Sequence, residues 1–178
     1  EQVLAVHVER QVDVQAAARL IRQGLGEGEQ DREPVYAATA ASRSLPDWGN
    51  TYVEIDLTGQ HVYMFQEGNL VWEAPCVTGN IAKNYNTPAG IYSLTYKEMD
   101  RILRGAKKAD GTYEYESHVD YWMPFNGGIG LHDADWRSKF GGTIYQYGGS
   151  HGCINLPPAK AKILYDLVYT GIPVICYN

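Results

Sequence analysis

Hydrophobic and polar residues alternate in several short runs of the chain, and this period of two predicts β-strands. The first run covers residues 51–57, where Val53, Ile55 and Leu57 share one face. A short turn leads into a second run at residues 61–65, so the two runs are predicted to form a hairpin. Further strands are expected at residues 70–77, 91–96, 119–125, 129–131 and 172–177. Short strands separated by turn residues are typical of an all-β domain.

One segment near the C-terminus has the period of a helix instead. Pro158 suits the first helical turn, and Gly171 ends the segment. Apolar residues line one side of it: Ala161, Leu164, Leu167 and Val168. Together, strands and helix predict a mostly-β fold, a sandwich or barrel-like domain with one helix in its C-terminal region.

The first 45 residues have a different character. A partly alternating apolar run at residues 3–8 is followed by a predicted helix over residues 14–23, with Asp13 as its N-cap. The apolar face of this helix is too small for a core of its own. We therefore expect residues 1–45 to be a partial α+β segment, the C-terminal fragment of an upstream domain plus a linker, and residues 46–178 to be one domain.

Residues 97–117 interrupt the strand pattern with a polar stretch that carries Arg101, Arg104, Lys107 and Lys108. A long insertion between strands is usually functional or mobile. We interpret it as a lid whose arginines attract an anionic substrate, and the alternative is a solvated loop whose charges only keep it soluble.

Composition excludes several classes of protein. The chain has 178 residues, is 44% hydrophobic and carries a formal net charge of −6, with no basic run flanked by aromatic residues. Nucleic acid is therefore not an expected partner. No apolar run approaches the ~20 residues that would span a bilayer. Because the first residue is Glu1 and not Met, we expect a processed or truncated chain, with room for a membrane anchor upstream.

Three cysteines, Cys76, Cys153 and Cys176, do not make a disulfide framework. Cys76 and Cys176 lie in apolar contexts, which favour packing over reactivity. Cys153 differs, because it stands in the sequence Ser-His-Gly-Cys-Ile-Asn at residues 150–155. A catalytic thiol needs a base, donors for an oxyanion and room for a substrate carbonyl. Polar neighbours and an adjacent glycine favour a nucleophile here over a structural cysteine.

Two histidines are candidates for the base, His151 beside the thiol and His132 at the end of a predicted strand. In an extended segment, His151 and Cys153 point to the same face. A strand–loop–strand return would bring His132 opposite the thiol. Either the Asp133 side chain or a backbone carbonyl would orient the His132 ring.

These residues carry a resemblance to a known family. His132, seventeen intervening residues and the motif at 150–155 are similar to the signature of L,D-transpeptidase catalytic domains (the YkuD-like family), and so are residues 121–125, 128–132 and 156–158. The resemblance covers about residues 51–178. In the family, a Thr-Pro-x-Gly turn recurs below the site, and residues 87–90 match it. Members often carry an accessory wall-associated domain upstream, which agrees with our interpretation of residues 1–45.

The resemblance implies roles for the residues of the motif. Cys153 would be the nucleophile, His132 the general base, and His151 part of the oxyanion pocket. The backbone N–H groups of Gly152 and Cys153 would be the oxyanion donors, with Ser150 supporting the network. For substrate binding we expect the following residues: Tyr121, Trp122, Asn155, Arg101 and Arg104.

The implied activity is that of a cysteine acyltransferase acting on peptidoglycan stem peptides. A tetrapeptide stem would acylate the thiol with loss of D-Ala, and the side-chain amine of a second stem would accept the acyl group, giving a 3→3 cross-link. No cofactor or metal is expected, and carbapenem β-lactams should trap the thiol. Such an enzyme would act outside the cytoplasm, at the cell wall, anchored to the outer face of the membrane.

Two alternatives remain at this stage. The first is a zinc site, with ligands drawn from His132, His151, Cys153 and His118, although no Cys-x-x-Cys or paired-histidine motif supports it. The second is a wall-binding module without activity, which would leave the polar cluster around Cys153 unexplained.

Overall fold

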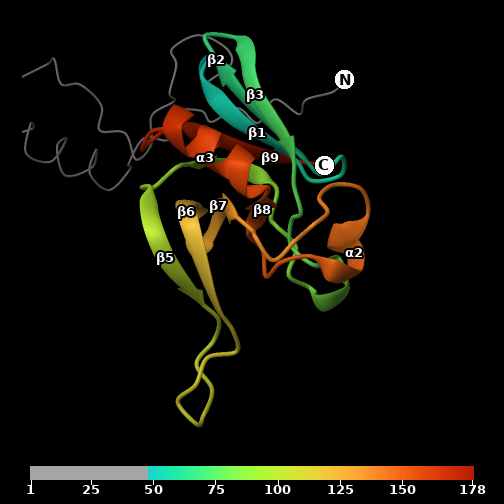
Figure 1. Ribbon diagram of the computed structural model, residues 1–178. Coiled ribbons are helices and arrows are strands. Elements are labelled where there is room, and N and C mark those ends of the chain that lie inside the picture. The colour runs from blue at the N-terminus through green and yellow to red at the C-terminus, as the bar shows by residue number, and fades with distance from the viewer. Residues whose placement is uncertain (1–47) are drawn as a thin grey trace, which may run out of the picture. The chain divides into compact units, whose positions relative to one another are not determined.

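The computed structural model describes residues 48–178. Our predictions for residues 1–45, the partial α+β segment and the upstream domain with its linker, lie outside the described residues and stay predictions. The described part is mostly β, as the sequence predicted, and its strands form two sheets (Figure 1).

The larger sheet has five strands in the order β3-β2-β1-β9-β4. These strands are β1 (Tyr52–Asp56), β2 (His61–Gln66), β3 (Asn69–Pro75), β4 (Gly90–Ser93) and β9 (Pro173–Tyr177). The hairpin predicted from the first two runs is confirmed, because β1 and β2 pair antiparallel with Ile55 opposite Val62. The C-terminal strand β9 runs parallel to β1 and antiparallel to β4, so the two ends of the domain share one sheet.

The smaller sheet has four strands in the order β5-β6-β7-β8. These strands are β5 (Glu98–Arg104), β6 (Glu116–Asn126), β7 (Ile129–Asp133) and β8 (Ile154–Leu156). β7 pairs in parallel with β8, and this register sets His132 opposite Asn155. The sheet therefore brings the upstream histidine next to the cysteine motif, which the sequence could only suggest.

The predicted C-terminal helix is confirmed as α3 (Pro158–Leu167), with proline in its first turn. Two further short helices were not predicted, the 3₁₀ helix η1 (Ile81–Lys83) and α2 (Ile144–Gly148). They are too short to show a helical period, and glycines flank α2. Within residues 48–178 no helix is both long and apolar enough to cross a membrane.

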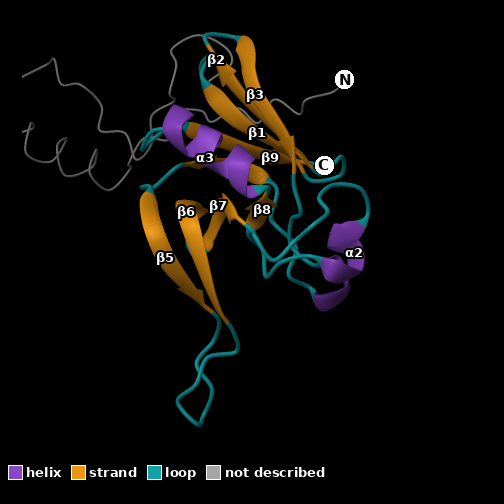
Figure 2. Cartoon of the chain, in the orientation of Figure 1, coloured by secondary structure: helices purple, strands orange, loops and turns teal. Residues whose placement is uncertain are grey.

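One apolar core joins the two sheets and α3. It contains Ile55 and Met64 from the larger sheet, Leu131 and Ile154 from the smaller one, and Leu164 from α3, all almost fully buried. The helix packs on β6 and β7 (Figure 2). Burying apolar surface stabilises the fold by about 25 cal/mol per Å², so both sheets and the helix are held by the same packing.

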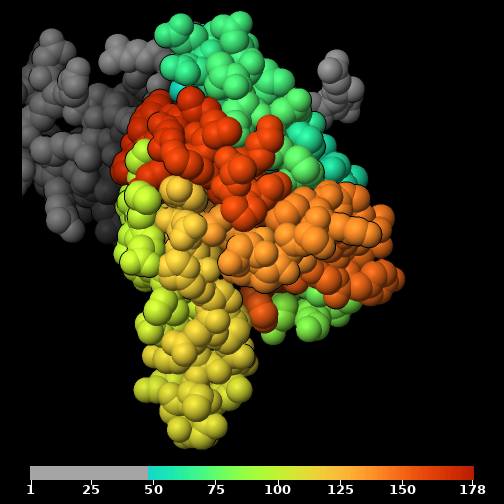
Figure 3. All heavy atoms as spheres, in the orientation of Figure 1, coloured from blue at the N-terminus to red at the C-terminus, as the bar shows by residue number. Residues whose placement is uncertain are grey.

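We expected residues 97–117 to be a long insertion between strands. In the structure they form part of a β-hairpin. Its first half forms strand β5, the edge strand of the smaller sheet, and pairs with β6. Large apolar residues such as Met99 and Ile102 are exposed on β5, which explains why the sequence lacks an inward-facing apolar pattern there. The connecting loop projects from the rest of residues 50–178 (Figure 3).

Candidate active site

His132 lies near the end of β7 and is only 3% exposed. Its ring is flanked by the indoles of Trp122 and Trp136, each with its ring centroid 5.9 Å from that of the imidazole. Burial lowers the pKa of His132 below its usual 6.5, because an apolar surround disfavours the charged imidazolium. The ring is therefore neutral near pH 7, the form in which an imidazole accepts a proton.

A backbone carbonyl orients the His132 ring. Nδ1 lies 2.7 Å from the carbonyl oxygen of Asp133. A carbonyl only accepts, so Nδ1 carries the proton and Nε2 keeps its lone pair. The Asp133 carboxylate instead accepts hydrogen bonds from the backbone N–H groups of Asp120 and Tyr121, at 3.1 and 2.8 Å. Of the two orienting groups considered from the sequence, the structure selects the carbonyl.

Cys153 lies just before β8 in the loop that follows α2. Its Sγ is 3.5 Å from the carbonyl oxygen of Gly128, which can accept the thiol proton. Burial raises the pKa of the Cys153 thiol to about 11, and a hydrogen bond from the backbone N–H of Gly130 opposes this rise. The thiol is thus protonated near pH 7 and needs a base to become a nucleophile.

Ser150 supports the cysteine loop from within. Its Oγ donates to the carbonyl of Cys153 at 2.6 Å and accepts from the N–H of Gly152 at 3.0 Å. The supporting role expected for Ser150 therefore has a geometric basis. We expected the N–H of Gly152 to be an oxyanion donor, but in this structure it donates to the Ser150 hydroxyl instead.

Gly152 has a conformational reason to be glycine. Its φ is +119°, and a Cβ at this position would lie 3.2 Å from Cδ1 of Ile129. Both features oppose any larger residue. The backbone beside the thiol is therefore held in a conformation that residues with a side chain rarely adopt.

Residues that follow β3 and residues that precede β4 brace this loop. Val77 and Asn155 exchange both backbone hydrogen bonds, at 3.0 and 2.9 Å. The hydroxyl of Thr87, in the Thr-Pro-x-Gly turn, accepts from the N–H of Gly79 at 3.0 Å and donates to the carbonyl of Gly152 at 2.7 Å. The turn thus fixes the residue that precedes the thiol.

Thr87→Val keeps the side-chain shape but removes the hydroxyl that joins Gly79 to Gly152. Because both backbone groups would then lack a buried partner, we expect a loss of about 1–3 kcal/mol in the free energy of unfolding. Urea denaturation measures this change. Thr95→Val is the matched control, since Thr95 is exposed. Equal unfolding midpoints for the two variants would contradict a bracing role for Thr87.

His151 is exposed and lies between two tyrosines. Its ring centroid is 4.6 Å from those of Tyr85 and Tyr115. Tyr115 belongs to the projecting hairpin, so His151 connects the cysteine loop to that hairpin. The ring contacts of His151 are therefore with Tyr85 and Tyr115.

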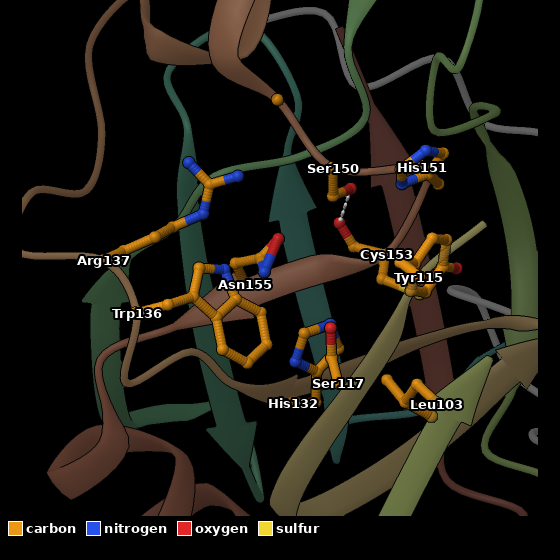
Figure 4. A pocket seen from close by; sticks show the side chains of 11 residues that line it. Leu103, Tyr115, Ser117, His132, Trp136, Arg137, Ser150, His151, Cys153 and Asn155 are labelled. Atoms are coloured by element: carbon orange, nitrogen blue, oxygen red, sulfur yellow. Dashed lines mark hydrogen bonds between the residues drawn. The ribbon is translucent and has the colours of Figure 1, made fainter. Parts of the chain in front are cut away.

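Side chains of the cysteine loop and of the projecting hairpin line one pocket with His132, and its volume is about 230 Å³. Figure 4 shows the side chains of Cys153, Ser150 and His132 toward its centre, and those of Arg137 and Trp136 on the side opposite His151 and Tyr115. The other lining residues are Leu103, Ser117, Gly149 and Asn155. A thiol and a neutral, oriented imidazole thus share one cavity.

The sequence model of the L,D-transpeptidase catalytic domain (YkuD) matches residues 50–176. The chain belongs to the L,D-transpeptidase family. A comparison with curated proteins found no match.

Solved structures of L,D-transpeptidases resemble this chain. A Cys-to-Ser mutant of the Enterococcus faecium L,D-transpeptidase is 33% identical, with a TM-score of 0.75 over 93% of this chain and 65% of that one. The Ldtfm–avibactam carbamoyl enzyme is 34% identical, with a TM-score of 0.76 over 94% of this chain and 64% of that one. The E. faecium catalytic domain acylated by ertapenem is 42% identical, with a TM-score of 0.63 over 72% of this chain and 98% of that one. The chain thus spans less than two thirds of the first two structures.

Of the five substrate-binding residues predicted for this L,D-transpeptidase domain, only Asn155 lines the pocket. Its side-chain Oδ1 is buried and has no hydrogen-bond partner. Tyr121 packs on Tyr165 of α3, and Trp122 packs against His132. These two aromatic residues do not line the pocket, because they pack behind His132 and under the helix.

Arg101 and Arg104 also do not line the pocket. Arg101 pairs with Glu98 at 2.9 Å, and Arg104 pairs with Glu116 at 2.7 Å, both on the exposed surface. Strand alternation points Arg104 away from the face on which its neighbour Leu103 reaches the pocket. The charges of Arg101 and Arg104 are therefore neutralised by these two glutamates and screened by solvent.

Sequence reasoning missed several pocket residues of this domain: Leu103, Tyr115, Ser117, Trp136 and Arg137. An exposed tryptophan four residues after the candidate base was the one usable signal. The zinc alternative required convergent ligands, and in residues 48–178 no three His, Cys, Asp or Glu side chains are placed to hold a metal. His118 instead pairs with Asp100 at 2.6 Å on the surface.

Proposed function

We propose that this chain is a peptidoglycan L,D-transpeptidase that works through a Cys153 acyl-enzyme. The observation that carries the proposal is the placement of Cys153 and His132 in one pocket, with His132 neutral and its tautomer fixed by the Asp133 carbonyl. Ertapenem acylates the 42%-identical E. faecium catalytic domain, which supports the same chemistry here.

In the first half-reaction, Cys153 attacks the carbonyl carbon of the third residue in a tetrapeptide stem. His132 takes the thiol proton at Nε2 as the C–S bond forms. This concerted transfer suits the pair, because the thiol pKa is raised to about 11 and the imidazole pKa is lowered. The C–N bond to D-Ala then breaks, and His132 returns the proton to the leaving amine.

In the second half-reaction, the side-chain amine of another stem attacks the thioester carbon. His132 accepts a proton from this amine, the C–S bond breaks, and Cys153 recovers a proton. The product is a 3→3 cross-link. The N–H of Cys153 serves as the oxyanion donor, since the N–H of Gly152 is occupied by Ser150. The residues alone suffice for this chemistry, without a metal or organic cofactor.

The proposed substrate also implies where in the cell the enzyme would act. Peptidoglycan lies outside the cytoplasm, so the domain would act at the cell wall, held to the outer face of the membrane by an upstream anchor. Carbapenems would inhibit it as covalent acylating agents.

Incubation with purified tetrapeptide muropeptides tests the proposal. We expect mass spectra to show loss of D-Ala and a cross-linked dimer. Hydrolysis without a dimer would make water the acceptor and refute the transferase. A chain that forms neither product nor ertapenem adduct would be the inert wall-binding module.

A further inference from the structure

Arg137 lies in the loop between β7 and α2 and is half-buried. Its Nη1 donates to the carbonyl of Gly148 at 2.8 Å, which fixes the side chain. Its Nε is buried and has no hydrogen-bond partner. Within the part of the chain that the structure describes, no carboxylate pairs with Arg137, whereas the surface arginines Arg101 and Arg104 each have one.

A half-buried guanidinium without a carboxylate partner is suited to bind an anion. Burial lowers the pKa of Arg137, although an arginine stays charged in a protein. Burying part of a cation without a counter-charge costs free energy, and a carboxylate from a ligand would offset this cost. The planar fork of arginine also matches the two oxygens of a carboxylate.

Arg137 is close to the reacting groups. It lines the same pocket as Cys153, and its positive charge is one of the causes that lower the pKa of His132. In Figure 4, Arg137 stands on the side of the pocket opposite His151 and Tyr115. The pocket thus has the Arg137 guanidinium on one side and the rings of His151 and Tyr115 on the other, with the thiol between them.

We propose that Arg137 binds the terminal carboxylate of the residue that leaves the donor peptide, and so selects donors that end one residue after the scissile bond. The inference rests on the proposed function. In such a donor, three covalent bonds separate the carboxylate carbon from the attacked carbonyl carbon, so the carboxylate remains inside the pocket. One more residue at the C-terminus would replace this carboxylate with a neutral amide and leave Arg137 unpaired.

The test compares a tetrapeptide donor that has a free C-terminal carboxylate with the same peptide as a C-terminal amide. A charge-assisted hydrogen bond predicts that the parent prefers the acid by about tenfold or more in kcat/KM. Arg137→Gln should abolish this preference, and Arg137→Lys should keep part of it. If Arg137 only supported the loop through Gly148, its loss would slow both donors equally, and an unchanged acid-to-amide ratio would overturn the proposal.

Arg104→Gln is the matched control, because it removes the same charge outside the pocket and should leave the ratio unchanged. A second measurement does not depend on the peptide reaction. Iodoacetate and iodoacetamide alkylate the same thiol and differ in charge, so Arg137→Gln should lower the iodoacetate-to-iodoacetamide rate ratio at Cys153. If the parent enzyme uses neither peptide, the proposed function fails. The iodoacetate-to-iodoacetamide ratio then still decides whether Arg137 attracts anions. An unchanged alkylation ratio counts against the inference.

Discussion

Cys153→Ala is expected to abolish both ertapenem adduct formation and peptide turnover. Of the residues that line the pocket, Cys153 alone carries a sulfur, so the substitution removes the atom proposed to form the acyl-enzyme and no residual adduct should remain. Intact-protein mass spectrometry measures the adduct directly, and the muropeptide assay measures turnover. Circular dichroism should show an unchanged fold, because the half-buried thiol contributes little packing.

The other two cysteines are the controls. Cys76 and Cys176 are buried in the core, and burial raises the pKa of the Cys176 thiol to about 12 and that of Cys76 well above its usual range. Neither thiol is accessible or ionised, so Cys76→Ala and Cys176→Ala should keep the adduct. An adduct that survives in Cys153→Ala, or disappears in either control, would move the nucleophile elsewhere.

His132→Gln is expected to slow acylation by ertapenem by about 10²-fold or more near pH 7. Glutamine can still donate to the Asp133 carbonyl, so the variant removes the base while it retains most of the local packing. The acylation rate is followed by mass spectrometry over time. His118→Gln is the control, since His118 is exposed and does not line the pocket.

The pH dependence separates a base from a structural residue. Because burial lowers the pKa of His132, the parent rate should fall on the acid side with a midpoint below 6.5. In His132→Gln this acid limb should vanish. The rate should then follow the thiolate and rise about tenfold per pH unit, up to the thiol pKa of about 11. If the variant kept the acid limb, another group would be the base, with His151 the next candidate.

The sequence predicted those parts of the fold that bury an alternating or helical apolar face. β1 and β2 were found because Val53, Ile55 and Val62 are fully buried at alternate positions, and α3 was found from Ala161 and Leu164. β5 was missed because an edge strand with exposed apolar residues lacks that pattern. Cys153, the candidate nucleophile, and His151 came from one local motif, whereas His132 came from the end of a predicted strand and from the family resemblance.

The rest of the site depends on pairings that no local pattern encodes. Arg137 stands in a polar stretch that is typical of a solvated loop, and only the fold turns it toward Cys153. Arg101 and Arg104 looked like the substrate cations, but nearby glutamates neutralise them. The choice of the Asp133 carbonyl over its carboxylate required the register of β6 against β7.

The hydrogen bond from Thr87 to Gly152 has a consequence for how the domain folds. It joins residues 65 positions apart in the chain, and the bond from the Asn80 side chain to Tyr147 joins residues 67 apart. Contacts between such distant segments form late, since closing a long loop costs entropy before any contact offsets it. The loop around Cys153 is therefore expected to take its final shape only after residues 80–87 have packed against residues 147–152. During refolding, reactivity toward ertapenem should appear with the last kinetic phase, and a short peptide containing only residues 150–155 would not have it.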